Sequence, residues 1–285
     1  MNNKLLSSAS LFVLLVCLII GFPQPTINHE DIVELAAASQ SPSAGVYPGC
    51  DTVVVITGAT SGIGLELASK LYDLGASTIV AIGRSKSKLD TLRTTLEENY
   101  PNAKGKLVPV VADLSDLDSV SHAANIIKKR FKRIDYLVNN AGLHLSQGDV
   151  ISSSPLLTEQ GYEMTFGVNY LSHFLLSEKL LPALKNSKHE ARIIQISSSF
   201  HWLSNSSALA PSVDGLLPPF ASRGDISSYM NSVLQRFRSY SFSKLAQILH
   251  MRALNTELLS RKVNNVRVLS ACPGWVGTNI GRGSK

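Results

Sequence analysis

Near its carboxyl-terminal end the chain carries a tyrosine and a lysine whose spacing suits proton transfer. Tyr240 and Lys244 lie four residues apart in RSYSFSKLAQILH, which has the apolar spacing of an amphipathic helix beginning near the tyrosine. Residues at positions i and i+4 share one helix face, so the two side chains are neighbours. On a protein surface such a pair stabilises a helix by only about 0.2–0.5 kcal/mol. In an active site, an ammonium that stabilises a phenolate would let the tyrosine act as a general acid or base.

The same spacing at Tyr100 and Lys104 carries no such meaning. Pro101 follows that tyrosine directly, so the pair lies in a loop rather than on a helix. Spacing alone therefore does not separate a surface pair from a catalytic one, and the surrounding elements must decide.

A second candidate site is a glycine-rich segment, TGATSGIG, between an apolar strand pattern and a helical pattern. Gly58 permits a sharp turn at the strand end, Gly62 a close approach of a pyrophosphate, and Gly64 close packing of the helix on the sheet. An ordinary flexible turn would have a similar composition, but the position between strand and helix favours a dinucleotide-binding loop. A P-loop is excluded because no Gly-Lys-Ser/Thr follows. The candidate cofactor-binding residues of the loop are Gly58, Thr60, Ser61, Gly62, Ile63 and Gly64.

The residue that would contact the adenosine ribose is an arginine. In a dinucleotide-binding fold, an acidic residue about 20 positions after the glycine loop binds the ribose 2′-hydroxyl. Here that position is Arg84, with Ser85 and Lys88 close by in IGRSKSK. An arginine pairs with a 2′-phosphate, so the sequence predicts NADP(H) in preference to NAD(H). The alternative is a surface arginine at the end of a strand.

Strand and helix patterns alternate from Asp51 onward. Strands are expected at 52–57, 77–83, 106–114, 134–140, 191–199 and 265–274. Helices are expected from the glycine loop to 74, at 87–99, 117–131 and 161–184, and from about 240. Short connections between alternating elements require parallel strands with helices on both faces. We therefore predict a single α/β domain over 51–285, a doubly wound parallel sheet of the Rossmann type. Pro109 predicts an irregularity in the third strand, because proline donates no ladder hydrogen bond.

Composition is that of a globular protein with an extensive core. Of the 285 residues, 44% are hydrophobic and 17% charged, which argues against wholesale disorder. The net charge is +6, and its densest basic run, from Lys128 to Arg133, falls at the end of a helical pattern. A solvated helix end explains this run, and attraction to anionic lipid is the alternative. No nucleic-acid-binding motif accompanies it, so no nucleic-acid partner is expected.

The three cysteines do not suggest a metal site. Cys17, Cys50 and Cys272 form no Cys-x-x-Cys pair, and the chain has neither H-E-x-x-H nor clustered ligands. Cys272 ends the last predicted strand, where a small core residue is expected. A catalytic metal is therefore not predicted.

The amino terminus has the features of a targeting segment. Lys4 precedes an apolar run from Leu11 to Ile20, which Pro23 ends. A positive start and a short apolar centre are typical of a signal peptide or membrane anchor, here residues 1–23, followed by a linker over 24–50. We expect import into the endoplasmic reticulum and membrane association through this segment, whether it is cleaved or kept. Targeting to another organelle is the alternative.

Four motifs occur in a characteristic order: TGATSGIG, NNAG, YSFSK and PGWVGT. In order and context they resemble the short-chain dehydrogenases/reductases, and the resemblance covers Asp51 to about Thr278. The segments GYEMTFGVNYLSHFLL and YSFSKLAQILHMRAL are most similar to the retinol-dehydrogenase-like branch. Protochlorophyllide oxidoreductases are similar in the same segments and are the second choice.

The resemblance assigns the catalytic roles. Tyr240 would be the general acid/base, with Lys244 beside it also holding the nicotinamide ribose. Asn169 would support a water in a proton relay. Lowering a phenol pKa from near 10 by about 2–3 units requires roughly 3–4 kcal/mol of preferential phenolate stabilisation. Lys244 and the positive ring of the oxidised nicotinamide would supply it.

Further roles follow from the same resemblance. Ser198, near the end of the fifth strand, would hydrogen-bond the substrate oxygen, and its neighbours Ser197 and Ser199 are alternatives. Cofactor contacts beyond the glycine loop and Arg84 would come from Asp113, beside the adenine, and from Asn139, Ala141, Gly142, Pro273, Gly274, Val276 and Thr278, with Tyr240 and Lys244 at the nicotinamide end.

The implied activity is hydride transfer between NADP(H) and a lipophilic alcohol or carbonyl compound, such as a retinoid or steroid. A reductase of a carbon–carbon double bond, as in protochlorophyllide reduction, is one alternative. A non-catalytic nucleotide-binding scaffold is another, although it would not need all of Asn169, Ser198, Tyr240 and Lys244. A homo-oligomer is compatible with the sequence.

Two features depart from the family pattern. Ser198 and Tyr240 lie 42 positions apart, far more than in most members, so an insertion is expected at about 200–238. It would either shape a hydrophobic substrate pocket through Phe200, Trp202 and Phe220, or form a disordered surface loop. The few polar and glycine residues after PGWVGT predict that the last strand and the substrate helix are lacking.

Overall fold

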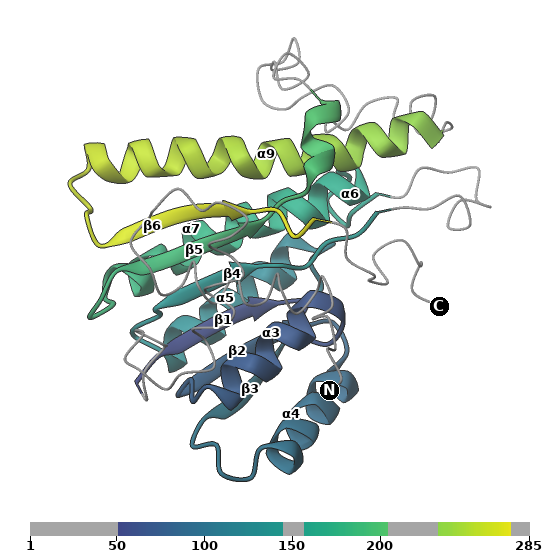
Figure 1. Ribbon diagram of the computed structural model, residues 1–285. Helices are drawn as coiled ribbons and strands as arrows, with labels where there is room; N and C mark the ends of the chain where they lie inside the picture. Colours follow the sequence, from purple (N-terminus) through teal and green to yellow (C-terminus); the bar gives the residue numbers. More distant parts are fainter. Residues whose placement is uncertain (1–50, 145–156, 205–232, 275–285) are drawn as a thin grey trace, which may run out of the picture.

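The computed structural model describes residues 51–144, 157–204 and 233–274 (Figure 1). The predicted leader and linker, Phe220 and most of the predicted insertion, Val276, Thr278 and the chain end lie outside these ranges. Among the described helices, none is both long enough and apolar enough to span a membrane.

The described part of the chain contains one parallel sheet of six strands in the order β3-β2-β1-β4-β5-β6. The strands are β1 (Val53–Thr57), β2 (Thr78–Gly83), β3 (Lys106–Val111), β4 (Tyr136–Asn139), β5 (Ala191–Ile196) and β6 (Val266–Ala271). This is the strand order of a doubly wound dinucleotide-binding fold, in which the order reverses between β1 and β4. The predicted fold class is confirmed.

Helices cover both faces of the sheet (Figure 1). They are α3 (Gly62–Asp73), α4 (Lys86–Asn99), α5 (Leu117–Arg130), α6 (Met164–Phe166), a π-helical turn (Gly167–Leu171), α7 (Ser172–Lys185), a 3₁₀ turn (Ser199–Leu203) and α9 (Val233–Ser260). Successive strand residues point to opposite faces. In β1, Val54 and Ile56 pack with the apolar side chains of α3 and α4, whereas Val55 packs with those of α5, α7 and α9. Burial on both faces explains the continuous apolar runs of the central strands.

The irregularity predicted at Pro109 is absent from β3. Pro109 stands in regular register with Ala81 of β2. The backbone N–H groups of Lys106 and Ala112 donate to the carbonyl oxygens of Ser77 and Gly83. The N–H groups of the even-numbered residues of β3 therefore point toward β2. Pro109 is odd-numbered, and β3 is the edge strand of the described sheet. An N–H at this position would point away from β2, where the described sheet has no further strand. The proline therefore costs no hydrogen bond of the ladder.

The long helix predicted before β5 starts later and is interrupted. Gly161 has a φ of +81°, a left-handed conformation outside a helix. The helix begins after Glu163, whose carboxylate accepts the N–H groups of Thr165 and Phe166 at 3.0 and 2.7 Å. The π-helical turn Gly167–Leu171 then separates α6 from α7. Such turns interrupt helices most often at functional sites.

Two further boundaries differ from the prediction. Helix α9 already includes Val233, upstream of the predicted start near Tyr240, and no proline or glycine between the two residues interrupts it. Cys272, predicted as a core residue, is exposed. Strand β6 ends at Ala271, and the cysteine lies beyond the covered sheet.

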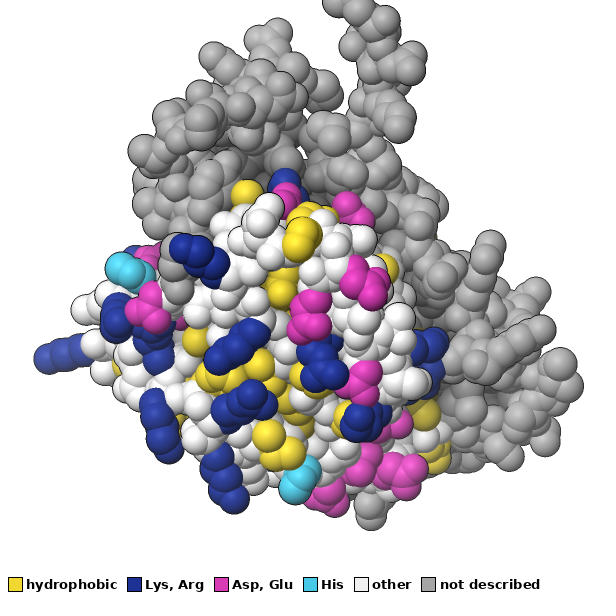
Figure 2. All heavy atoms as spheres, turned by 90° about the horizontal axis from the view of Figure 1, so that it is seen from below, with side chains coloured by type: hydrophobic (Ala, Val, Ile, Leu, Met, Phe, Trp, Pro, Cys, Tyr) yellow, Lys and Arg dark blue, Asp and Glu magenta, His cyan; other side chains and the backbone are white. Residues whose placement is uncertain are grey.

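Charges of both signs lie on the surface. On the face in Figure 2, Lys and Arg side chains are spread among neutral and hydrophobic ones, and acidic side chains gather toward one half. The residues from Lys128 to Arg130 form the last turn of α5, where positive charge complements the helix dipole.

Candidate active site

The glycine loop joins β1 to α3 at the carboxyl edge of the sheet. Gly58 and Gly62 have φ values of +67° and +53°, which favour glycine. A Cβ on Gly58 would lie 3.0 Å from Ala141 Cα, so the segment after β4 packs directly on the loop. The N-cap residue of α3, Ser61, makes no side-chain hydrogen bond to the helix end. The first amide groups of α3 are therefore left for an anion.

Thr57 and Asn140 hold this loop against the segment after β4. The Thr57 hydroxyl oxygen accepts the backbone N–H groups of Asn140 and Ala141, both at 2.9 Å. The Asn140 side chain donates to the Thr57 carbonyl oxygen at 2.8 Å. Asn139, predicted as a cofactor contact, is buried, and its side-chain amide donates to Ser177 Oγ at 3.0 Å. Asn140 was missed, although the NNAG motif contains it.

Arg84 and Asp113 follow neighbouring strands. Arg84 comes directly after β2, and Ser85 caps α4 by accepting the Lys88 N–H at 3.3 Å. Asp113 comes shortly after β3, and its carboxylate accepts the N–H of Ser115 at 2.9 Å. Since parallel strands end at the same edge, Arg84 and Asp113 share the edge of the glycine loop.

The structure brings Ser198 and Tyr240 together. Tyr240 is 9% exposed within α9, and the Ser198 side chain is near enough to its hydroxyl to act on it. Ser197 is committed elsewhere, since its buried hydroxyl donates to the Lys244 carbonyl oxygen at 2.9 Å. Ser199 is exposed in the 3₁₀ turn. Of the three serines, Ser198 is therefore the one placed for chemistry with the phenol.

Two rings that sequence reasoning did not assign to Tyr240 enclose it. Phe200 and His144 both meet its ring edge-on, with centroids 6.0 and 5.0 Å away. Phe200 had been predicted only as a pocket residue, and His144 carried no recognisable sequence signal.

Lys244 is a buried residue close to Tyr240. Its ammonium is 5.6 Å from the Tyr240 ring centroid, and it donates to the Ile196 carbonyl oxygen at 2.7 Å. Gly142 lies next to it, because a Cβ built there would be in ordinary van der Waals contact with Lys244 Nζ at 3.5 Å and with Asn169 Oδ1 at 3.4 Å. The lysine, the glycine and the asparagine thus meet at one point.

The side chain of Asn169 is occupied by structural bonds. Its Oδ1 accepts the Leu143 N–H at 2.8 Å, and its Nδ2 donates to the Leu143 carbonyl and to Ser243 Oγ, each at 3.0 Å. Asn169 lies in the π-helical turn, which could not be read from the sequence. As placed, it fixes the segment that follows β4, and the structure supports this bracing role more directly than a water relay.

The protein's own groups raise the pKa of Tyr240, whereas the predicted mechanism requires a lowered pKa. Burial raises the pKa of Tyr240, the Ser198 hydrogen bond lowers it, and nearby Cys272 raises it further. Burial also lowers the pKa of Lys244 to about 7. Desolvation disfavours both the phenolate and the ammonium. A lowered phenol pKa thus needs positive charge from a bound cofactor.

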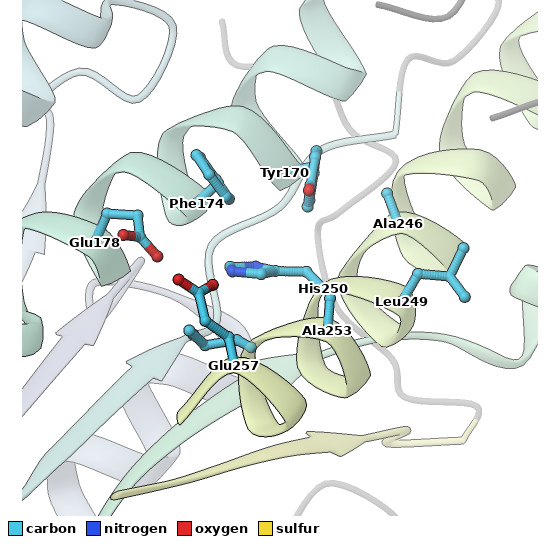
Figure 3. Close-up of a pocket in the computed structure, with 9 residues that line it drawn as sticks. Tyr170, Phe174, Glu178, Ala246, Leu249, His250, Ala253 and Glu257 are labelled. Atoms are coloured by element: carbon cyan, nitrogen blue, oxygen red, sulfur yellow. The ribbon is translucent and has the colours of Figure 1, made fainter. Parts of the chain in front are cut away.

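A cavity of about 420 Å³ lies elsewhere, between α7 and α9 (Figure 3). Its lining includes Tyr170, Phe174, Glu178, His250 and Glu257. Ser198, Tyr240 and Lys244 do not line it, so it is separate from the candidate active site.

Comparison with known proteins agrees with this arrangement. The sequence model of the family described as short chain dehydrogenase matches residues 52–206. Retinol dehydrogenase 14 of Mus musculus is 34% identical over 254 residues, which are 86% of this chain and 67% of the relative. The chloroplastic short-chain dehydrogenase TIC 32 B of Brassica napus is 33% identical over 234 residues, 81% of this chain. The chain spans 65% of the length of that relative.

Solved structures share the fold. A metagenomic short-chain oxidoreductase in complex with NADP is 28% identical with a TM-score of 0.54, covering 79% of this chain and 83% of that one. The Pseudomonas aeruginosa RhlG/NADP complex has a TM-score of 0.57 at 24% identity, covering 82% of this chain and 78% of that one.

Gly64→Ala tests the packing of the glycine loop. The new Cβ would lie 2.3 Å from the Gly58 carbonyl oxygen and 2.5 Å from Asn140 Nδ2. Alanine gains about 1 kcal/mol in helix propensity, but the overpacking outweighs it, so we expect a net loss of about 1–3 kcal/mol in the free energy of unfolding. Urea unfolding measures it. Gly83→Ala is the control, because its nearest contact is a Leu89 side-chain carbon at 3.4 Å. Equal stabilities of the two variants would contradict the packing.

Proposed function

The chain belongs to the short-chain dehydrogenase/reductase family, in its retinol-dehydrogenase-like branch, and on that premise we propose that it is an NADP(H)-dependent oxidoreductase. It would transfer hydride between the nicotinamide and a lipophilic alcohol or carbonyl compound. The observation that carries the proposal is the placement of Tyr240 with the Ser198 side chain acting on its hydroxyl and Lys244 Nζ 5.6 Å from its ring. A non-catalytic scaffold has no need of this arrangement, and no contact among the described residues favours a carbon–carbon double-bond reductase.

The described residues fit a dinucleotide phosphate. Gly58 and Gly62 adopt φ values of +67° and +53° beside the uncapped start of α3, which suits a pyrophosphate. Arg84 makes no ion pair with another described residue and lies where a ribose 2′-phosphate would be met. Two similar structures hold NADP. These features support NADP(H) over NAD(H).

The site residues would move the proton that accompanies hydride transfer. When bound, NADPH supplies the hydride to the carbonyl carbon. Ser198 would donate a hydrogen bond to the carbonyl oxygen, and Tyr240 would give that oxygen its phenolic proton. Burial raises the pKa of Tyr240, so the phenol holds its proton at neutral pH, ready to donate it. Lys244 would then stabilise the phenolate left behind. Alcohol oxidation uses the same steps in reverse.

Apolar surroundings support a lipophilic substrate. Phe200 packs on the Tyr240 ring, and Trp202 and Leu203, in the same 3₁₀ turn, are 81% and 66% exposed. Exposed apolar side chains in the turn whose Phe200 packs on the Tyr240 ring suit an apolar alcohol. Among the relatives, human polyprenol dehydrogenase is 30% identical over 82% of this chain. Its name refers to a polyprenol and those of the retinol dehydrogenases refer to retinol, and both are apolar alcohols.

The destination in the cell is proposed from the leader. Residues 1–23 have the composition of a signal peptide or membrane anchor, which supports the endoplasmic reticulum. The chloroplastic relative supports organelle targeting as the alternative.

Tyr240→Phe tests the acid/base role. The variant keeps the ring between Phe200 and His144 but loses the proton, so turnover should fall by at least about 100-fold while NADPH affinity stays nearly unchanged. Steady-state oxidation of NADPH with retinal, steroid and fatty-aldehyde substrates measures it. Tyr100→Phe, which removes a hydroxyl distant from this site, should change little. A Tyr240→Phe enzyme with most of its activity would disprove the mechanism.

Arg84→Asp tests the cofactor preference. Replacing a guanidinium by a carboxylate turns attraction for a 2′-phosphate into repulsion, so NADPH binding should weaken by at least about 2 kcal/mol. NADH binding should change less or improve. Fluorescence titration with both cofactors measures these affinities. Arg130→Asp makes the same charge change at the last turn of α5, at the opposite edge of the sheet, and should affect both cofactors equally. A wild-type preference for NADH would overturn the reading of Arg84.

A further inference from the structure

A buried histidine joins the glycine loop to the helix that carries Asn169. His173 is 1% exposed and lies in the first turn of α7, just after the π-helical turn. Its Nε2 is 2.9 Å from Thr57 Oγ1, and its Nδ1 is 2.9 Å from the Asn169 carbonyl oxygen. The mechanism above makes no use of His173.

The partners of the ring fix its tautomer. The Asn169 carbonyl oxygen can only accept, so Nδ1 must carry the hydrogen. The same oxygen also accepts from Gln247 Nε2 at 2.9 Å. With Nδ1 protonated in the neutral ring, Nε2 is an acceptor. Thr57 must therefore donate to it.

The Thr57 hydroxyl is then fully used. Its oxygen accepts the N–H groups of Asn140 and Ala141, both at 2.9 Å, and its single hydrogen goes to His173 Nε2. The other acceptor within reach, the Val138 carbonyl oxygen, is farther away at 3.4 Å. A protonated imidazole would direct a second N–H at an oxygen that already accepts two. Burial accordingly lowers the pKa of His173 to about 4, which keeps the ring neutral.

This chain of bonds connects two parts of the site. One end is Thr57, immediately before the glycine loop, and the segment it holds continues to Gly142, against Lys244 and Asn169. The other end is the backbone of Asn169, whose carbonyl also receives Gln247 of α9, one turn beyond Lys244. A dinucleotide that extends from the glycine loop to Tyr240 would contact both parts at once. Their relative position therefore matters for hydride transfer.

We propose that His173, as the neutral Nδ1–H tautomer, is a positioning residue that holds the glycine loop in register with the Tyr240–Lys244 pair. The proposal rests on the proposed function, because register matters only if a cofactor spans both parts. Misplacement of reacting groups by about 1 Å can reduce turnover on the order of 100-fold. Loss of His173 should therefore impair both NADPH binding and turnover in a protein that is still folded.

The wild-type protein provides the first test, and it needs no variant. In a spectrum of protein with ¹⁵N-labelled histidine rings, His173 should show a protonated Nδ1 and an unprotonated Nε2 at pH 7, its signals assigned by their loss in His173→Gln. A protonated Nε2, or a doubly protonated ring, would overturn the proposal. The spectrum does not depend on activity, so it is informative even if the proposed function fails.

Variants that keep one half of the connection provide the second test. The amide of His173→Asn can still donate near the Nδ1 position, toward Asn169, and that of His173→Gln can still accept near the Nε2 position, from Thr57. His173→Leu does neither. We expect the leucine variant to lose about tenfold or more in NADPH affinity and in kcat, and each amide variant to lose less. His122→Gln, an exposed histidine of α5, is the matched control and should behave as wild type.

A double-mutant cycle separates positioning from mere stability. If His173 acts through the Thr57 hydroxyl, adding His173→Leu to Thr57→Val should weaken NADPH binding little beyond either change alone. Thr57→Ser, which keeps the hydroxyl, should bind NADPH nearly as wild type does. Additive effects would overturn the proposal, and so would a folded His173→Leu protein with wild-type NADPH affinity and kcat. An active Tyr240→Phe enzyme would instead remove the proposed function without changing the ring tautomer.

Discussion

An ammonium group held in the protein interior is the constraint on which the rest of the site depends. Lys244 is 2% exposed, and a buried cation is costly unless hydrogen bonds replace its water. The Ile196 carbonyl oxygen, at the carboxyl end of β5, takes one of its hydrogens at 2.7 Å. This bond requires α9 to lie against the edge at which the parallel strands end.

Burial also sets the resting charge of the pair. It raises the pKa of Tyr240 and lowers that of Lys244 to about 7, so each group is pushed toward its neutral form. The phenol keeps its proton until positive charge arrives with an oxidised cofactor or a proton acceptor arrives with the substrate. The cofactor thus takes part in the acid–base chemistry, because Lys244 alone does not ionise Tyr240.

Much of this arrangement is readable from the sequence, and the remainder depends on tertiary contacts. Buried parallel strands are continuous apolar runs bounded by glycines and polar residues. The six strands, their doubly wound parallel arrangement and the glycine loop can therefore be predicted from the sequence pattern. Motif order also predicts a common site for Tyr240, Lys244 and Ser198, which the structure brings close together. Pattern cannot show the π-helical turn, because its backbone hydrogen bonds are set by the packing around Asn169.

The other features that differ from the sequence-based predictions also depend on tertiary contacts. The sign of the Tyr240 pKa shift depends on how deeply the ring is buried between Phe200 and His144, which are distant from it in sequence. The position of Pro109 was harmless only because β3 is an edge strand. His173 resembles any other polar residue within a helical pattern until Thr57 is placed beside it.

The central claim is that the protein alone keeps Tyr240 protonated and that the oxidised cofactor releases its proton. Tyrosinate absorbance, measured against pH as the difference between wild type and Tyr240→Phe, tests it directly. We expect ionisation above the ordinary tyrosine value of about 10 in the free protein, and at clearly lower pH once NADP⁺ is bound. A Tyr240 pKa already below 10 without cofactor, or one that NADP⁺ leaves unchanged, would contradict the account.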